Sequence, residues 1–463
     1  MTAAPTPVFE RIAHQQAAAV VIEAPDAAAH ASRIWRWGLK SVLSIVDQGL
    51  TAAVGFGVNF LLARSLPTPI YGAFAVAFAL YLFVSGFHNV LLLEPLSVLG
   101  PARHRHDLCA YFRAQTAIHA ALVGVLAILV ILTGLATMQL APANPLGAAL
   151  AGSGLALPFL LLLWLARRMC YVVNRPATAV LGSAVYSLLV LASFLVAWKA
   201  GKVTPSSAFL LMGAACLATS VLLLWRLGLR ANRAQTERAL EWTRVLRENW
   251  LYGRWLVGSA VLYAATSQLQ MVLAAAFLGL GAAGILRAMQ IPSLVMTQII
   301  TATGLLVLPA LSYNFARGET QRLRRRATLV SLVLGAFALA FVGVLAFFGA
   351  PIERILYAGK YAPYTSLMAM LALIPVMNGF AAGFSIAMRA SQKPQFDLIS
   401  NVVAAPVGLL SALLFMRWWG LAGAAVSMVL GFAALALTTF VCFRLSAEHD
   451  RRVAVAQPCV SSD

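Results

Sequence analysis

Charged residues are scarce in this sequence, and acidic ones are the scarcest. Only 11% of its 463 residues are Asp, Glu, Lys or Arg, and just 15 of these are acidic. In contrast, 61% of the residues are hydrophobic, and the mean hydropathy is +0.84. A chain of this size with so little polar material cannot cover the surface of a water-soluble globule. The composition therefore predicts an integral membrane protein.

The sequence also lacks the short motifs of common enzymes. It contains no GxxxxGK[ST] phosphate loop, HExxH zinc pair, GxSxG elbow or paired-Asp glycosyltransferase signature. ATP hydrolysis by this chain is excluded, and we expect a protein that is not an enzyme and has no metal or other cofactor. The five cysteines show no CxxC pair or metal-ligand spacing. Residues 1–32 lack the order of a signal peptide, so we interpret them as part of a cytoplasmic tail.

Long apolar runs fill most of the chain, in two groups of six separated by the basic stretch 226–254. As helices rising about 1.5 Å per residue, all are long enough to cross a hydrocarbon core of about 30 Å, whereas a barrel strand needs only about 10 residues. We therefore expect an all-α integral membrane protein with twelve transmembrane helices. The spans are predicted at 41–64, 71–99, 109–137, 146–166, 177–198, 206–228, 253–278, 282–311, 327–350, 363–388, 396–416 and 420–443.

The net charge of +19 could indicate a nucleic-acid partner, so its distribution matters. With both termini placed in the cytoplasm, 27 of the 34 Lys and Arg residues fall in inner segments and six in outer segments. Such a bias follows the positive-inside rule and sets the topology. We therefore assign the charge to topology and expect no nucleic-acid partner; a dedicated anionic-lipid patch is the alternative.

This layout predicts five regions. They are a flexible cytoplasmic tail (1–40), an N-lobe of six helices (41–228), a cytoplasmic linker (229–252), a C-lobe of six helices (253–444) and a cytoplasmic C-terminal tail (445–463). In the linker, Trp242, Leu246 and Trp250 share one helical face, which predicts an amphipathic helix on the inner membrane surface. A solvated hinge is the alternative.

The two halves show weak similarity to each other. The segment Asn59–Gly72 aligns with Met271–Gly284, an offset of about 212 residues, and the glycines and prolines occur in the same order in both halves. This pattern supports a parallel repeat of six plus six helices, an arrangement used by transporters that alternate between two faces of a membrane.

One arginine lies inside a predicted span. Arg287 falls about five residues from the outer end of span 282–311, and Gln290 follows it on the same helical stripe. A guanidinium keeps its charge and offers a planar fork to phosphate or carboxylate oxygens. Facing an aqueous cavity, Arg287 would form an anion-binding site. Snorkelling toward the outer headgroups is the alternative.

Two other spans carry polar side chains along one helical face. These are Gln48 and Asn59 in span 41–64, and Tyr263, Thr266 and Gln270 in span 253–278. We predict that they line a central cavity together with Arg287; holding helices together is the alternative. Arg64 ends the first span, and we interpret it as an interfacial residue or a substrate contact.

Two acids lie at matched depths near the inner ends of the first two spans. Asp47 and Glu94 are candidates for exchanging a proton or binding Na⁺, and pairing with Arg103 or Lys40 is the alternative. Pro95 removes a helical hydrogen bond and predicts a kink after Glu94. In the same span, we interpret His88 as a packing residue, with a proton relay as the alternative.

Residues 46–80 resemble the start of the bacterial oligosaccharide flippases, the Wzx-type or polysaccharide-transport branch of the MOP superfamily. The resemblance rests on a first helix with Asp-Gln and Asn-Phe that ends at Ala-Arg and leads to Tyr-Gly. Looser matches extend it over residues 40–444. The matching residues are Asp47, Gln48, Asn59, Phe60, Ala63, Arg64, Tyr71, Gly72 and Phe74, followed by Glu94-Pro95, Asn249-Trp250, Gly253-Arg254-Trp255, Arg287-Ala288, Leu308-Pro309 and Arg389-Ala390.

The resemblance implies a function. It implies two six-helix lobes around a cationic cavity that carries a polyprenyl-diphosphate-linked oligosaccharide from the inner to the outer leaflet of the bacterial inner membrane. Arg287 is the position that best matches the cavity arginines of related lipid II flippases. Polysaccharide polymerases and glycosyltransferases of the same pathway are the implied partners. Proton or Na⁺ coupling, or the membrane potential, would drive the step.

Two other functions remain open at this stage. A multidrug exporter of the same superfamily would use acids deep in its cavity; Asp47 and Glu94 permit this, and Arg287 argues against it. A membrane polysaccharide polymerase or ligase would typically need a large outer loop with basic residues, and every predicted outer loop is short.

Overall fold

The computed structural model describes residues 27–228, 241–391 and 395–456 of the chain. Within these ranges the protein consists of helices joined by short turns, and no strand occurs. The prediction of an all-α fold is confirmed. The helices are α2 (Ala27–Ser65), α3 (Thr68–His88), α4 (Glu94–Arg103), α5 (Leu108–Leu140), α6 (Pro145–Val172), α7 (Pro176–Lys199), α8 (Pro205–Arg226), α9 (Trp242–Ala264), α10 (Gln270–Leu278), α11 (Leu280–Ala316), α12 (Thr320–Tyr357), α13 (Thr365–Leu371), α14 (Leu373–Ala390) and α15 (Gln395–Ala456), together with the π-helical turns η1 (Asn89–Leu93) and η3 (Ala265–Leu269).

Membrane-length segments occur where the sequence predicts them. In the described residues, 11 helical segments are long and apolar enough to cross a membrane. The last of them, Leu398–Ser446, contains the two final predicted spans. Gly420 separates these spans, because its φ of 53° and ψ of −123° lie outside the helical region, and a positive φ favours glycine. The structure therefore contains all twelve predicted spans.

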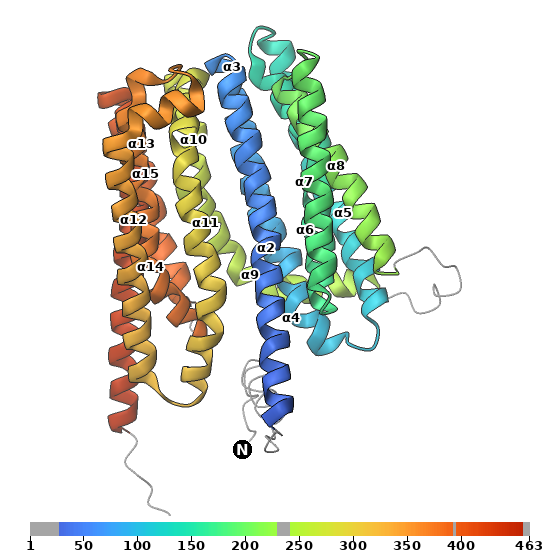
Figure 1. Ribbon diagram of the computed structural model, residues 1–463, viewed down its shortest axis with the longest axis vertical. Coiled ribbons are helices and arrows are strands. Elements are labelled where there is room, and N and C mark those ends of the chain that lie inside the picture. The colour runs from blue at the N-terminus through green and yellow to red at the C-terminus, as the bar shows by residue number, and fades with distance from the viewer. Residues whose placement is uncertain (1–26, 229–240, 392–394, 457–463) are drawn as a thin grey trace, which may run out of the picture.

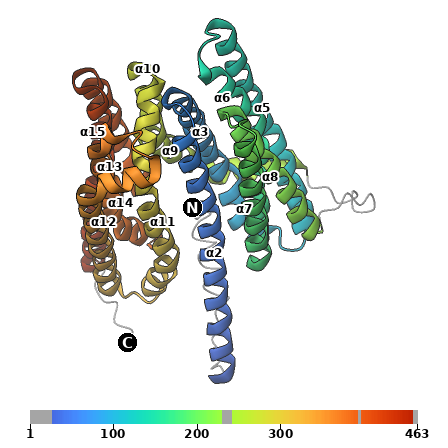
Figure 2. The ribbon, with the colours of Figure 1, turned by 45° about the horizontal axis from the view of Figure 1, so that its top comes forward.

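The helices form two bundles that lie side by side (Figure 1). α5 to α8 belong to one bundle, α10 to α15 to the other, and α2 and α3 lie between them in both views (Figures 1 and 2). Proline at the first turn starts α6, α7 and α8, where a missing N–H costs nothing and the fixed φ suits a helix. We call the end with the arginine-rich turns the inner end, following the topology predicted from sequence, and the opposite end the outer end.

The first and last helices extend into the two predicted tails. α2 starts at Ala27, inside the predicted flexible tail 1–40, and α15 continues to Ala456, inside the predicted tail 445–463. The alanine-rich composition before the first span explains the early start, because alanine has the highest helix propensity. Residues 1–26, 229–240 and 457–463 of the predicted tails and linker lie outside the described residues.

The first half of α9 covers the described part of the predicted linker and packs on the N-lobe. The side chains of Asn249 and Gln115 in α5 exchange two hydrogen bonds of 3.1 and 3.0 Å. Glu248 lies 2.9 Å from His104. Val245 is buried, whereas Trp242, Leu246 and Trp250 are exposed along one face. This part of the linker is therefore a helix that packs on the N-lobe with one buried and one exposed face. Its position on the inner membrane surface stays a prediction.

Two glycines that the repeat aligns meet where the lobes touch. A Cβ atom on Gly72 of α3 would lie 1.8 Å from the carbonyl oxygen of Leu280, and one on Gly284 of α11 would lie 2.5 Å from that of Thr68. Position 68 plus the offset of the repeat is position 280, so each half makes the same contact with the other. A two-fold relation between the halves produces such a self-complementary contact. Only glycine allows helix backbones to approach so closely.

Candidate functional site

Arg287 lies at the contact between the two lobes near the outer end. Its Nε donates to Oδ1 of Asn59 in α2 over 3.3 Å, and its Nη1 donates to Oε1 of Gln290 over 3.3 Å. The guanidinium carbon lies 5.1 Å from the ring centre of Phe78 in α3. Three residues predicted from sequence to share a site, Arg287, Gln290 and Asn59, are therefore brought together across the lobe boundary.

The charge of Arg287 is not balanced by a carboxylate. The side chain is 8% exposed, and no acid among the described residues forms an ion pair with it. The buried hydroxyl of Tyr71 lies close to the guanidinium and interacts with it, but it makes no hydrogen bond of regular geometry within the described part of the chain. Two of the five N–H donors of an arginine are thus used, both in long bonds to neutral oxygens. A buried cation with spare donors is suited to binding an anion.

The lobes also meet above Arg287 at the outer end. Lys360, in the turn after α12, donates to the carbonyl oxygens of Leu66 and, over 2.8 Å, of Ala63, at the end of α2. The hydroxyl of Tyr361 donates to the same Ala63 oxygen over 3.1 Å. A cation here suits the negative end of the helix dipole and satisfies carbonyls left unpaired where the helix ends. Arg64 is exposed and donates to the carbonyl oxygen of Ile355 over 3.2 Å, so it bridges the lobes.

Burial in this contact shifts the pKa values of the two side chains from the turn. The pKa of the Lys360 ammonium lies below its usual value because partial burial disfavours the charge. Burial also raises the pKa of the Tyr361 hydroxyl to about 12.

The polar side chains of the predicted span 253–278 lie in another part of the C-lobe than Arg287. Thr266 and Gln270 are fully buried inside the C-lobe against α15, where Nε2 of Gln270 lies 3.4 Å from the carbonyl oxygen of Ser427. Gly408 and Gly431 of α15 make room for the Gln270 amide. This placement favours the helix-packing interpretation of Thr266 and Gln270. Tyr263, in contrast, is 47% exposed.

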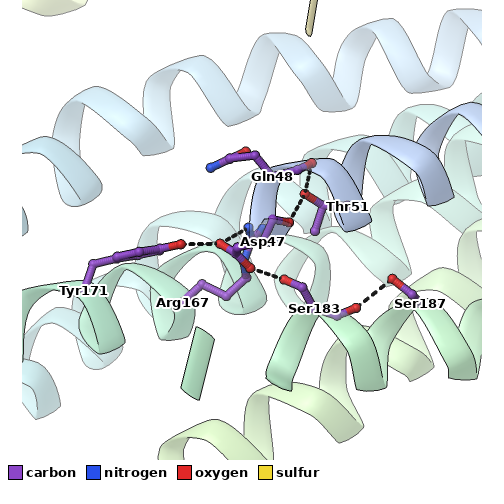
Figure 3. A network of polar contacts seen from close by, with 7 residues as sticks. All are labelled: Asp47, Gln48, Thr51, Arg167, Tyr171, Ser183 and Ser187. Carbon is purple, nitrogen blue, oxygen red and sulfur yellow. Dashed lines mark hydrogen bonds and ion pairs between the residues drawn. The ribbon is translucent and has the colours of Figure 1, made fainter. Parts of the chain in front are cut away.

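Asp47 is the centre of a buried polar network within the N-lobe (Figure 3). One carboxylate oxygen, Oδ2, accepts from Nη2 of Arg167 and from the hydroxyl of Tyr171, each over 2.6 Å. The other, Oδ1, accepts from Ser183. Asp47 is fully buried, and Arg167 is nearly so. Gln48, the next residue, is exposed and contributes its backbone oxygen to Thr51 instead.

The partner of Asp47 is neither Lys40 nor Arg103, the two cations that the sequence offers as alternatives to a bound proton or Na⁺. It is Arg167, which directly follows the predicted span 146–166 and so counts among the inner-segment arginines. The ion pair joins α2 to α6, which is 120 positions away along the chain. Because an arginine shortly before a turn satisfies the positive-inside rule, the rule gives no sign that this one turns inward. Tyr171 and Ser183 carry no sequence signal beyond their polarity within spans.

Glu94 follows the π-helical turn η1, where its backbone N–H bonds to the carbonyl oxygen of Asn89 five residues earlier. Its Oε1 accepts from Nδ2 of Asn89 over 3.1 Å. Arg168 of α6 and Tyr252 of α9 lie within electrostatic range. The helical distortion that Pro95 predicts thus takes the form of a π-helical turn directly before it.

Comparisons with known proteins agree on the fold. No protein-family model and no curated protein matches the sequence. Among solved structures, an inward-facing multidrug resistance MATE family transporter of the MOP superfamily has a TM-score of 0.75 with 11% identity, covering 88% of this chain and 96% of its own. The lipid II flippase MurJ in an inward closed conformation has a TM-score of 0.65 with 12% identity, covering 87% of each chain. An outward-facing MATE transporter has a TM-score of 0.62 with 11% identity, covering 89% of this chain and 95% of its own.

These structures are all transporters that span membranes. At 11–12% identity the likeness concerns the fold alone. Their coverage includes both lobes, so the match is not restricted to one bundle. The chain has the two-lobed, twelve-span fold of the MOP-superfamily transporters.

Proposed function

We propose that the protein is a flippase that moves a polyprenyl-diphosphate-linked oligosaccharide from the inner to the outer leaflet of a bacterial inner membrane. The observation that carries this proposal is the environment of Arg287. The side chain is a buried guanidinium at the lobe contact, has no carboxylate partner among the described residues, and lies beside the buried hydroxyl of Tyr71. A diphosphate supplies the negative charge and the acceptor oxygens that this environment lacks.

The contacts between the lobes at the outer end support an approach of the substrate to Arg287 from the inner side. The contacts of Lys360, Tyr361 and Arg64 hold the lobes together beyond it. The higher TM-score with the inward-facing MATE structure than with the outward-facing one accords with this conformation. An anion that binds Arg287 competes with Asn59 for its donors and so weakens a bond between the lobes. Substrate binding would thereby favour opening of the outer end.

A multidrug exporter is the second candidate, because the MATE transporter has the higher TM-score of the two kinds of neighbour. An exporter of lipophilic cations needs acids open to its cavity. Asp47 is fully buried and already paired with Arg167. The charge balance at the lobe contact therefore favours an anionic substrate. A polysaccharide polymerase or ligase has no support from these neighbours.

Ion coupling at Asp47 or Glu94 stays part of the proposal. In this conformation Arg167 supplies the positive charge that a bound proton or Na⁺ would supply. A coupling role for Asp47 therefore requires Arg167 to move away during the cycle. Bacterial polymerases and glycosyltransferases of a surface-polysaccharide pathway are the proposed partners that consume and supply the substrate.

Proteoliposomes test the function directly. The purified protein is reconstituted with a fluorescent polyprenyl-diphosphate oligosaccharide, and the sugar that becomes accessible across the bilayer is measured over time. We expect protein-dependent movement, reduced about tenfold or more in Arg287→Gln and less in Arg287→Lys, because lysine keeps the charge but loses the planar fork.

Arg354→Gln is the matched control, because Arg354 is an exposed arginine near the same end of the molecule. It should move the lipid at the wild-type rate. Export of a cationic dye without movement of any lipid-linked sugar would replace the flippase with the multidrug exporter. Equal rates for Arg287→Gln and wild type would remove Arg287 from the substrate path.

A further inference from the structure

Two buried histidines in the N-lobe contact each other through their rings. Nε2 of His88, at the end of α3, lies 3.0 Å from Nδ1 of His119 in α5, and the ring planes are nearly perpendicular. Their side chains are 1% and 3% exposed. The function proposed above does not use this pair.

A third group fixes the tautomers of both rings. Nε2 of His119 lies 3.1 Å from the carbonyl oxygen of Pro158 in α6, which can only accept a hydrogen bond. Nε2 of His119 therefore carries a hydrogen, and Nδ1 of the neutral ring accepts. His88 must then donate from its Nε2, which leaves its own Nδ1 as a bare acceptor.

That acceptor has no partner. Nδ1 of His88 is buried without a hydrogen bond in the described part of the chain. Buried polar atoms are almost always satisfied, and an exception requires an explanation. Packing accounts for the His88–His119 and His119–Pro158 bonds but not for the unpaired Nδ1 of His88. A single buried lone pair on an imidazole is a site for one proton.

The surroundings of the pair hold no fixed charge that would neutralise a proton. His119 is the only titratable group among the described residues that acts electrostatically on His88. The charged and titratable groups of the elements packed around the pair lie further along each helix. They include Tyr81 on α3, Glu94 after η1, Tyr111 and Arg113 on α5, Arg167, Arg168 and Tyr171 on α6, and Arg244, Arg247, Glu248, Tyr252 and Arg254 on α9. An added proton would therefore be stable only in a conformation that brings water or one of these groups to the pair.

A deformable element adjoins the pair. The π-helical turn η1 begins at Asn89, directly after His88, and packs against α9 at Val90, where Gly253 allows close contact. Irregular π-helical turns occur often at functional sites. α9 continues into the C-lobe, so a change in η1 is mechanically connected to the movement of the lobes.

We propose that the His88–His119 pair is a proton-binding site, separate from Asp47 and Glu94, whose protonation couples transport to a proton gradient. In the outer-closed conformation the pair is neutral and dry. In the alternative conformation a hydronium ion transfers its proton to Nδ1 of His88, which forms an N–H bond and releases water. Return to the outer-closed conformation delivers the proton to water on the inner side. The transport consequence rests on the proposed flippase function, whereas proton binding by the pair does not.

The transport test compares wild type, His88→Gln and His106→Gln in the proteoliposome assay with imposed pH gradients. Glutamine keeps a donor near the Nε2 position, so it preserves the bond to His119 and removes the proton-accepting Nδ1. His106 is exposed and serves as the control. With one proton per cycle, a gradient of one pH unit changes the steady-state distribution of the lipid by about tenfold. We expect this response in wild type and His106→Gln, and a response below about twofold in His88→Gln.

A second measurement does not depend on the substrate. Solid-state NMR of protein with ¹⁵N-labelled histidine, in liposomes, reports the protonation of each ring nitrogen as the pH is lowered. We expect both rings of the pair to be Nε2–H tautomers at neutral pH, and Nδ1 of His88 to become protonated at low pH. Spectra of His88→Gln and His119→Gln assign these signals among those of the seven histidines. A full gradient response in His88→Gln, or flipping by wild type that ignores the gradient, would overturn the coupling role. If no lipid moves at all, the flippase function fails. Independently, the pair is rejected as a proton site if its nitrogens never titrate while the protein stays folded.

Discussion

Breaking the ion pair between Asp47 and Arg167 should strongly destabilise the N-lobe. The pair is 2.6 Å long and buried, with side-chain exposures of 0% for Asp47 and 10% for Arg167. Replacing Arg167 with methionine keeps much of the side-chain volume but leaves the carboxylate without its cation. Removing one partner of a buried pair costs about 3–5 kcal/mol. Because Tyr171 and Ser183 still donate to Asp47, we expect a loss near the lower limit, about 3 kcal/mol.

The double variant distinguishes the pair from general packing. In Arg167→Met with Asp47→Asn, no buried charge remains, so the loss should fall to about 1 kcal/mol. Unfolding would be followed by tryptophan fluorescence in mixed micelles with increasing denaturing detergent. Arg175→Met is the matched control, because Arg175 is an exposed arginine at the same end and should change stability by less than about 0.5 kcal/mol. The reasoning is refuted if Arg167→Met lowers the free energy of unfolding by less than about 1 kcal/mol. It is also refuted if the losses measured for Arg167→Met and Asp47→Asn alone simply add in the double variant.

Three further changes test the contacts that hold the conformation. Gly284→Leu should prevent the approach of α3 and α11 and make cysteines placed near the outer end several times more reactive to a water-soluble reagent, because even a Cβ atom would lie 2.5 Å from a backbone oxygen. Lys360→Met should increase the same reactivity by a smaller factor, because it leaves the carbonyls at the end of α2 without their donor; Lys360→Arg should restore most of the protection. Gln115→Leu should cost about 1–3 kcal/mol of stability by leaving the buried Asn249 amide without a partner, and a second change, Asn249→Leu, should recover most of it. Unchanged cysteine reactivity in both outer-end variants would show that these contacts do not close the outer end, and no recovery in the double leucine variant would show that packing, rather than the amide pair, stabilises α9 on the N-lobe.

The requirements of a membrane explain why the sequence predicts the fold so well. A segment that crosses hydrocarbon must satisfy its backbone internally and must be apolar over its length, so all twelve spans are visible as runs of residues. The alignment of Gly72 with Gly284 also predicts a real relation, because backbones can approach so closely only where both residues lack a side chain. Arg287, Gln290 and Asn59 were grouped by their polarity within spans, and the structure places them together.

Other features depend on how the helices pack, which no local pattern encodes. Thr266 and Gln270 have the same polarity and helical spacing as a cavity lining, yet they face α15, because the rotation of a helix about its axis depends on its neighbours. The partner of Asp47 is an arginine at the inner end of its span, a position that the positive-inside rule explains without any partner. Lys360 looks like an ordinary outer-loop residue until the turn after α12 is placed over the end of α2.

The sequence by itself thus determined that the chain lies in a membrane, how many spans it has and which polar residues lie inside those spans. Transfer of a segment into hydrocarbon depends on that segment's own composition, so these features can be predicted locally. Tertiary structure alone decided which of those polar residues satisfy one another. Asp47 forms an ion pair with Arg167, and His88 contacts His119, whereas Arg287 donates only to neutral oxygens. These outcomes depend on contacts between helices distant in sequence, and the unmatched charge of Arg287 and the unmatched nitrogen of His88 became visible only when every neighbour was in place.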